Sequence, residues 1–196
     1  MSESRESKAL LRQRQRQLRR ALDAQERGRL DQSIRAHLRR LIASRGVRTV
    51  AAFWPFDGEP DLVPLLRQLT ADGVGLALPV VTGGAGGSMA FHEWLPDTVM
   101  LKSAYGIPEP QGTAARAARD LDLIVMPLAA YDPGGNRLGM GAGYYDRCLA
   151  TVRDAAAPLR AGVAYSLQEV ASIAADAWDV PLHGVVTEKG WLAFDA

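Results

Sequence analysis

The chain has 196 residues, of which 47% are hydrophobic and 23% are charged, and its formal net charge at pH 7 is +1. This composition is typical of a folded globular protein and excludes general disorder, and the length suits a single domain spanning residues 1–196. The near-neutral charge excludes a general preference for nucleic acids. No apolar run approaches the roughly 20 residues that span a membrane.

The N-terminal segment and the cysteine count predict a cytoplasmic protein. Residues 2–20 are rich in charge and have no apolar stretch of the kind found in secretory signals. Cys148 is the single cysteine of the sequence, so no internal disulfide can form, which fits a reducing compartment. His37, His92 and His183 are far apart, and their spacing does not indicate a zinc site.

The beginning of the chain predicts an amphipathic helix over residues 7–22 with a basic face. The leucines of this stretch are expected to share one side: Leu11, Leu18 and Leu22. Lys8, Arg12 and Arg16 recur every four residues, so they project together from a neighbouring side. On the residues alone these charges are typical of a solvated helix, and the stretch lacks the aromatic residues of a nucleic-acid site.

The rest of the chain predicts helices that alternate with strands. Helices are expected at residues 25–44, from Asp61 to just before Gly73, at residues 144–153, and from a capping box at Ser166 and Glu169 to about Ala175. Strands are expected at residues 47–54, 74–81, 89–94, 121–128, 160–165, 185–187 and 191–194. This order predicts an α/β three-layer α/β/α sandwich with a mostly parallel sheet.

The most informative stretch of the chain is residues 135–147, GNRLGMGAGYYDR. Its glycines stand at alternate positions: Gly139, Gly141 and Gly143. Such a backbone leaves N–H groups open to a charged oxygen, and Arg137 adds a cation beside it. Asp146 adds a carboxylate suited to Mg²⁺, and Tyr144 and Tyr145 add aromatic surface. The pattern favours a phosphate-binding loop over a flexible turn.

The glycine spacing does not match two familiar nucleotide-binding loops. A dinucleotide site needs GxGxxG directly after a strand, whereas the spacing here is GxGxG and begins several residues beyond Leu128. A P-loop ends in Gly-Lys-Ser or Gly-Lys-Thr, which this stretch lacks. The prediction of phosphate binding therefore rests on the residue types and not on a fingerprint.

Motifs in the same order over nearly the whole chain match one known family. They are the segment from Met126 to Arg147, Lys8 to Arg12, Gly58 to Asp61, Gly106 to Pro110, Gly162 to Tyr165 with Gln168, Asp179 to Pro181, and Val186 to Glu188. The segment from Met126 to Arg147 is the most specific of them. On these motifs the chain resembles the 5-formyltetrahydrofolate cyclo-ligase family, also called 5,10-methenyltetrahydrofolate synthetases.

The resemblance implies a fold of the NagB/RpiA/CoA-transferase-like type and a reaction that uses ATP with Mg²⁺. The expected reaction converts 5-formyltetrahydrofolate and ATP into 5,10-methenyltetrahydrofolate, ADP and phosphate. The γ-phosphoryl group moves to the formyl oxygen, N10 attacks the activated carbon, and phosphate leaves. Such a site has to align its two substrates and neutralise charge, and it needs no nucleophilic serine or cysteine.

By the same resemblance, Arg137 and Asp146 are the catalytic residues, and Asp146 and Asp179 contact Mg²⁺. Asp132 is expected to organise the glycine loop. The residues expected to bind ATP are Lys8, Arg12, Arg137, Leu138, Gly139, Met140, Gly141, Ala142, Gly143, Tyr144 and Tyr145. The residues expected to bind the folate substrate are Arg12, Trp54, Glu59, Tyr105, Glu109, Tyr144 and Tyr145.

Ordinary structural explanations for these residues stay open on the sequence alone. Glu59 can be a loop acid, and Trp54 a core residue. Asp146 can be a carboxylate at the start of a helix, where the helix dipole favours it, and Asp179 an ordinary turn residue.

Other functions also stay open. One is an ATP- or sugar-phosphate-binding enzyme of the same fold with another acceptor, and another is a non-catalytic folate-binding protein. The sequence shows no long exposed apolar helix that needs a partner, which favours a monomer.

Overall fold

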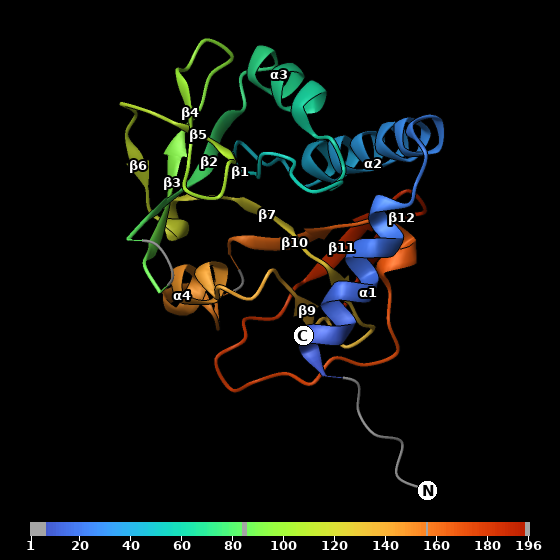
Figure 1. Ribbon diagram of the computed structural model, residues 1–196. Coiled ribbons are helices and arrows are strands. Elements are labelled where there is room, and N and C mark those ends of the chain that lie inside the picture. The colour runs from blue at the N-terminus through green and yellow to red at the C-terminus, as the bar shows by residue number, and fades with distance from the viewer. Residues whose placement is uncertain (1–6, 84–85, 156, 195–196) are drawn as a thin grey trace, which may run out of the picture.

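The structure is a computed structural model that describes residues 7–83, 86–155 and 157–194 (Figure 1). The strands of its main sheet are β1 (Thr49–Ala51), β2 (Gly75–Thr82), β3 (Ser88–Glu93), β6 (Ala115–Arg116), β7 (Leu123–Pro127), β10 (Leu159–Val163), β11 (Gly184–Thr187) and β12 (Gly190–Ala193). Their order across the sheet is β12-β11-β10-β7-β1-β2-β3-β6. Outside this sheet, β4 (Met100–Lys102) pairs with β5 (Pro108–Pro110), and β8 (Ala130–Tyr131) pairs with β9 (Arg137–Leu138).

The middle of the sheet is parallel, as the alternation of strands and helices predicted. β1 runs parallel to β2 and β7, and β10 runs parallel to β7 and β11. The edges are antiparallel, with β3 and β6 on one side and β12 on the other. The predicted α/β class with a mostly parallel sheet is therefore confirmed, and its NagB/RpiA/CoA-transferase-like type stays a prediction.

The longest helices lie at the beginning of the chain, and side chains cap them. The helices are α1 (Lys8–Arg20), α2 (Ala24–Ser44), α3 (Val63–Ala71) and α4 (Tyr144–Leu149), with 3-10 turns η1 (Ala118–Asp120), η2 (Ala150–Val152) and η3 (Ser166–Gln168). Ser7 Oγ accepts a hydrogen bond from Leu10 N at 3.3 Å and so caps α1. Asp23 caps α2 by accepting one from Glu26 N at 2.8 Å. Within the described ranges, no helix combines the length and the apolar character that crossing a membrane requires.

The sheet is covered on both faces, and β7 shows how the sequence achieves this. Alternate side chains of a strand point to opposite faces. Leu123 and Val125 join the cluster formed with α2 and α3, whereas Ile124 and Met126 join the cluster formed with α4. Figure 1 shows α2 and α3 on one side of the sheet and α4 on the other. The three predicted layers are present, although non-helical chain such as that around Leu182 covers much of the α4 face.

α1 buries polar side chains that its leucine pattern did not predict. Leu11 is buried, but Leu18 is 48% exposed, and the other buried side chains of this helix are Gln15 and Arg19. Arg19 donates to the carbonyl oxygen of Asp57 at 2.9 and 3.1 Å, so the helix packs against polar loop backbone there. The helix itself was predicted correctly; of its expected apolar residues, Leu11 and Leu22 pack against hydrophobic clusters and Leu18 does not.

The helix predicted over residues 166–175 is also wrong, because it is replaced by the turn η3 followed by extended chain. Backbone N–H groups that a helix needs are bound elsewhere. Val170 N donates to Tyr131 O at 2.9 Å, and Ile173 N donates to Asp132 Oδ2 at 2.7 Å. Tertiary hydrogen bonds thus outweigh the local capping signal.

Candidate active site

A cavity of about 810 Å³ opens where the parallel strands β1, β2 and β7 end. Phe53 follows β1, Val81 lies near the end of β2, and Pro127 closes β7, and all three line the cavity. Ligands of α/β sheets bind in the crevice outside the carboxyl ends of the strands. The cavity therefore occupies the position that the fold offers for a site.

The glycine segment forms the wall of this cavity between β9 and α4. Gly141 and Gly143 have φ angles of +103° and +68°, which side chains disfavour. The turn before them is held by Asp132, whose carboxylate accepts hydrogen bonds from the N–H groups of Gly134 and Asn136, both at 3.0 Å. Asp132 therefore shapes the entrance to the glycine segment, as expected.

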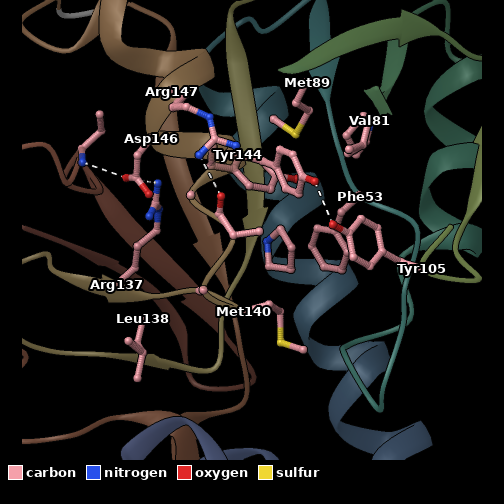
Figure 2. Close-up of a pocket in the computed structure, with 18 of the residues that line it drawn as sticks. Phe53, Val81, Met89, Tyr105, Arg137, Leu138, Met140, Tyr144, Asp146 and Arg147 are labelled. Atoms are coloured by element: carbon pink, nitrogen blue, oxygen red, sulfur yellow. Dashed lines mark hydrogen bonds and ion pairs between the residues drawn. The ribbon is translucent and has the colours of Figure 1, made fainter. Parts of the chain in front are cut away.

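Arg137 and Asp146 form the charged centre of the cavity (Figure 2). Arg137 Nη2 lies 2.7 Å from Asp146 Oδ1, and the two side chains are only 6% and 16% exposed. The same carboxylate oxygen accepts a hydrogen bond from Val180 N at 3.0 Å. Arg137 Nε is buried and has no hydrogen-bond partner among the described residues. Arg137 thus keeps a donor for a ligand oxygen while Asp146 fixes its orientation.

α1 carries two basic side chains into the same cavity. Lys8 Nζ lies 2.6 Å from Asp176 Oδ2 and 3.2 Å from Asp179 Oδ2. Burial lowers the pKa of Lys8, but the two carboxylates outweigh that effect and the net shift is upward. Arg12 Nε donates to Gly139 O at 2.7 Å, so α1 is fastened directly to the glycine segment.

Glu59 is a buried acid in the wall of the cavity. Its Oε2 accepts a hydrogen bond from Phe56 N at 3.1 Å, and its Oε1 lies 3.8 Å from Arg19 Nη1. Burial raises the pKa of Glu59 to about 7, although Arg19 and the Phe56 N–H oppose the shift. Trp54, also in the wall, packs edge-on against Trp94 with ring centroids 6.2 Å apart. Trp54 therefore belongs to the core and to the cavity at once.

Tyr105 and Tyr144 meet on the side of the cavity away from Arg137 (Figure 2). Their hydroxyl oxygens are 2.8 Å apart, and their rings lie edge-on. Tyr145 faces the cavity as well, and its hydroxyl is buried with no hydrogen-bond partner in the described part of the chain. Glu109 is buried, and this burial raises the pKa of its carboxyl group.

The structure brings all the predicted site residues to this one cavity. Every residue expected to bind ATP, folate or Mg²⁺ is part of its lining. Leu138 is a special case, because its side chain is buried against Leu11 and Ile173 and leaves its backbone to face a ligand. Asp179 belongs to the same lining as Asp146, but its carboxylate is bound to Lys8. The roles of these residues stay predictions.

The sequence reasoning missed Asp57 and Trp178. Asp57 accepts hydrogen bonds from Arg16 at 2.7 Å and Arg19 at 3.1 Å, and it also pairs with Arg20. The available signal was the dipeptide Asp57-Gly58, which is typical of a turn, and the structure gives Asp57 a φ of +55°. Trp178 lines the cavity but remains 69% exposed, which no pattern in the sequence indicates.

Comparison with known proteins assigns the chain to a family. The model of the 5-formyltetrahydrofolate cyclo-ligase family matches residues 4–188. The chain belongs to this family. The resemblance drawn from the motifs is therefore confirmed.

Relatives and solved structures agree with the assignment to the 5-formyltetrahydrofolate cyclo-ligase family. The 5-formyltetrahydrofolate cyclo-ligase of Haemophilus influenzae is 34% identical, over 87% of this chain and 92% of the relative. That of Escherichia coli K12 is also 34% identical, over 90% and 98% of the two chains. The solution structure of Aquifex aeolicus 5,10-methenyltetrahydrofolate synthetase is similar with a TM-score of 0.82 and 34% identity, over 96% of this chain and 93% of that chain.

Proposed function

We propose that this chain is an ATP-dependent 5-formyltetrahydrofolate cyclo-ligase, which forms 5,10-methenyltetrahydrofolate, ADP and phosphate. Family membership over residues 4–188 carries the proposal, because the same span contains every residue that lines the cavity. The geometry supports it, since one cavity contains a buried arginine–carboxylate pair, a glycine segment and a second, largely apolar side. These are the parts that a phosphoryl transfer to an organic acceptor needs.

The folate substrate is assigned to the apolar side of the cavity. Phe53 and Tyr105 lie together there in Figure 2, away from Arg137 and Asp146. A pterin is flat and presents adjacent N–H donors, which suit aromatic walls and the carboxylate of Glu59. Trp54, Tyr105, Glu109 and the two tyrosines of the glycine segment complete this proposed subsite, with Arg12 at its boundary with ATP.

The phosphates of ATP are assigned to the glycine segment and the basic side chains around it. Gly139, Gly141 and Gly143 carry no side chain that blocks their backbone, and the Nε of Arg137 is a buried donor without a partner among the described residues. Lys8 and Arg12 reach the same wall from α1. This arrangement places positive charge where the γ-phosphoryl group has to be transferred.

The residues of the site account for the chemistry of the proposed reaction. The formyl oxygen attacks the γ-phosphorus and ADP leaves, which turns a poor leaving oxygen into phosphate. N10 then attacks the formyl carbon, loses its proton and expels phosphate. The role of Arg137 is to bind and orient the transferred phosphoryl oxygens, while the cavity walls hold the two substrates in line and limit the access of water.

Mg²⁺ is the metal implied by the family resemblance, and the donors of the site fit it. Among the described residues, no group of three or more histidine, cysteine or acidic side chains is placed to hold a metal ion. Mg²⁺ is usually bound by one or two carboxylates together with substrate phosphates, so a complete protein cage is not required. Asp146, and Asp179 once released by Lys8, are the carboxylates assigned to it. When bound, the ion neutralises charge on the phosphates.

The proposal further assigns the enzyme to the cytoplasm as a monomer. The single cysteine supports a reducing compartment, because it can form no disulfide within the chain.

The proposal is tested by incubating the protein with 5-formyltetrahydrofolate and MgATP. The expected result is a rise in near-ultraviolet absorbance from the conjugated methenyl product, with one ADP formed per product molecule. ATP hydrolysis without this product contradicts the proposal and points to another acceptor. Binding of the folate with no turnover at saturating MgATP points to a sequestering protein.

A further inference from the structure

Trp178 is an exposed indole in the wall of the cavity. It is the most exposed of the large hydrophobic side chains in the described ranges, at 69%, and it lines the cavity together with Arg153 and Val180. Trp178 is not part of any hydrophobic cluster of the described residues. The folded chain therefore gains little from this large apolar side chain, which suggests that a ligand covers it.

The backbone that carries Trp178 is fixed on both sides of the indole. Val180 N donates to Asp146 Oδ1 at 3.0 Å, and Asp179 N donates to the carbonyl oxygen of Asp176 at 3.0 Å. Asp176 N donates in turn to Asp179 Oδ2 at 2.9 Å. Arg153 Nη1 donates a hydrogen bond to the carbonyl oxygen of Ala177, the residue just before Trp178. The backbone around the indole is therefore already fixed before a ligand binds, so binding has to order little of the chain.

The position of Trp178 along the cavity assigns it to one of the two substrates. Because Val180 is bonded to Asp146, the indole lies two residues from a backbone contact with the Arg137–Asp146 pair. The folate is assigned to the opposite side, beside Tyr105 and Glu59. Transfer of the γ-phosphoryl group requires both substrates to meet at Arg137. The remainder of ATP therefore extends away from the folate, towards the wall that Trp178 and Arg153 form.

We propose that Trp178 is the base-stacking residue of the ATP site, a role that rests on the proposed function. Every nucleobase has a flat π-face, and stacking on a tryptophan depends on that face and not on hydrogen bonds to the base. Arg153, beside it in the lining, is placed to add positive charge near the ribose and the α-phosphate. Trp178 thus sets affinity for a nucleoside, whereas Arg137 and the glycine segment bind the phosphates.

The test compares binding of ATP and of inorganic tripolyphosphate, which has the phosphates but no base. Dissociation constants are measured by calorimetry with Mg²⁺ and without folate, so that the measurement does not depend on turnover. Trp178→Ala should weaken ATP binding by roughly 5- to 100-fold, while tripolyphosphate binds as it does to the wild type. Trp178→Phe should recover most of the ATP affinity, and Trp178→Leu, which keeps apolar bulk but no ring, should not.

Leu192→Ala is the matched control, because Leu192 is also an exposed apolar residue, at 46%, and lies on β12 outside the cavity. It should bind both ligands as the wild type does. Unchanged ATP affinity in Trp178→Ala overturns the proposal, as does an equal loss for tripolyphosphate, which would show that the indole only supports the phosphate site. If the wild type binds ATP through Trp178 but forms no methenyl product, the assigned reaction fails and the stacking role stands.

Discussion

At the scale of single residues, the buried pair of Arg137 and Asp146 has a structural role beside the chemical role proposed for it. Arg137 lies in the short strand β9, not in a free loop, and its guanidinium is almost buried against Asp146. A buried pair of this kind is costly to break, because the remaining charge loses its partner. The pair therefore fixes the position of Arg137 in the folded chain, and its Nε remains without a hydrogen-bond partner among the described residues.

Replacing Arg137 should separate these two roles. Arg137→Ala should lower turnover by about 10²–10³-fold, because a donor to transition-state charge is lost. It should also lower the melting temperature, since Asp146 is left without its cation. Arg137→Lys keeps the charge but not the planar fork, so it should retain part of the activity and most of the stability. Turnover and thermal unfolding measured on the same samples decide this, and wild-type turnover in Arg137→Ala removes the residue from the mechanism.

Glu59 gives the site a pH dependence of predictable sign. Burial raises its pKa in the folded protein to about 7, from an ordinary value of 4.5. The uncharged acid is thus the form that the fold prefers, so its contribution to stability is complete below pH 4.5 and is lost as the pH rises through about 7. Glu59→Gln removes this loss. Its free energy of unfolding, measured with denaturant, should exceed that of the wild type by more at pH 8 than at pH 5.

The affinity for the folate substrate should depend on pH in the opposite direction, rising as Glu59 ionises. Only the ionised carboxylate can accept both pterin N–H groups, so the wild type should bind 5-formyltetrahydrofolate more tightly at pH 8 than at pH 6. Glu59→Gln should bind it weakly at both values. A stability difference that is the same at pH 5 and pH 8 contradicts the raised pKa, whichever way binding behaves.

At the scale of elements, α1 is held in position by charge more than by apolar packing. Arg16, Arg19 and Arg20 all reach the carboxylate of Asp57, in the loop between β1 and α3. Burial raises the pKa of Asp57, but hydrogen bonds from Arg16 and Arg20 outweigh it and hold the pKa below its usual range. This loop also carries Glu59, so one carboxylate connects the helix that supplies Lys8 and Arg12 to the part of the cavity wall that contains Glu59.

Asp57→Asn should loosen this connection. The Asp57 side chain is only 6% exposed, and removing one partner of a buried ion pair typically costs about 3 kcal/mol. For a chain of this length that corresponds to a fall in melting temperature of roughly 6–12 °C. Because the pKa of Asp57 is lowered, its contribution is present at neutral pH and is lost only as the pH falls through the folded-state pKa. The variant should therefore differ from the wild type less in strong acid than at pH 7.

Asp72→Asn is the control for this experiment. Asp72 also pairs with an arginine, Arg39, but the two side chains are 50% and 55% exposed. Exposed pairs contribute little, so the melting temperature should fall by at most about 4 °C. Equal effects of the two substitutions would show that Asp57 is an ordinary surface charge.

The helices and strands also show which features of the fold could be predicted from the sequence. The helix α2 was predictable because its apolar residues repeat with the helical period, and the strand β7 because its apolar run is unbroken, as in a strand covered on both faces. The buried face of α1 was not, since Arg19 is buried by contacts with a loop that is distant in sequence. The helix expected after Tyr165 failed for the same reason, because Tyr131 and Asp132 bind its backbone N–H groups. The strand expected at residues 47–54 is shorter in the structure, where it is β1, because the chain after β1 leaves the sheet and forms part of the cavity wall.

At the scale of the whole molecule, the sheet explains why scattered motifs form one site. β1, β2 and β7 are parallel neighbours, so the segments that follow them meet at one edge. The residue types of the site could be read from the sequence and from the resemblance to the family. Their pairing could not, because Lys8 meets Asp176, and Arg137 meets Asp146, only through the folded path of the chain.

The two ion pairs of Lys8 also determine when, during synthesis of the chain, this part of the cavity wall can form. Its partner Asp176 lies 168 residues further along the chain, and Asp179 lies 171 residues away. A polypeptide still emerging from the ribosome has synthesised α1 long before these carboxylates exist, and contacts between such distant segments form late in folding. The nascent chain therefore exposes Lys8 without its partners Asp176 and Asp179, and this part of the cavity wall is completed only after both residues have been synthesised.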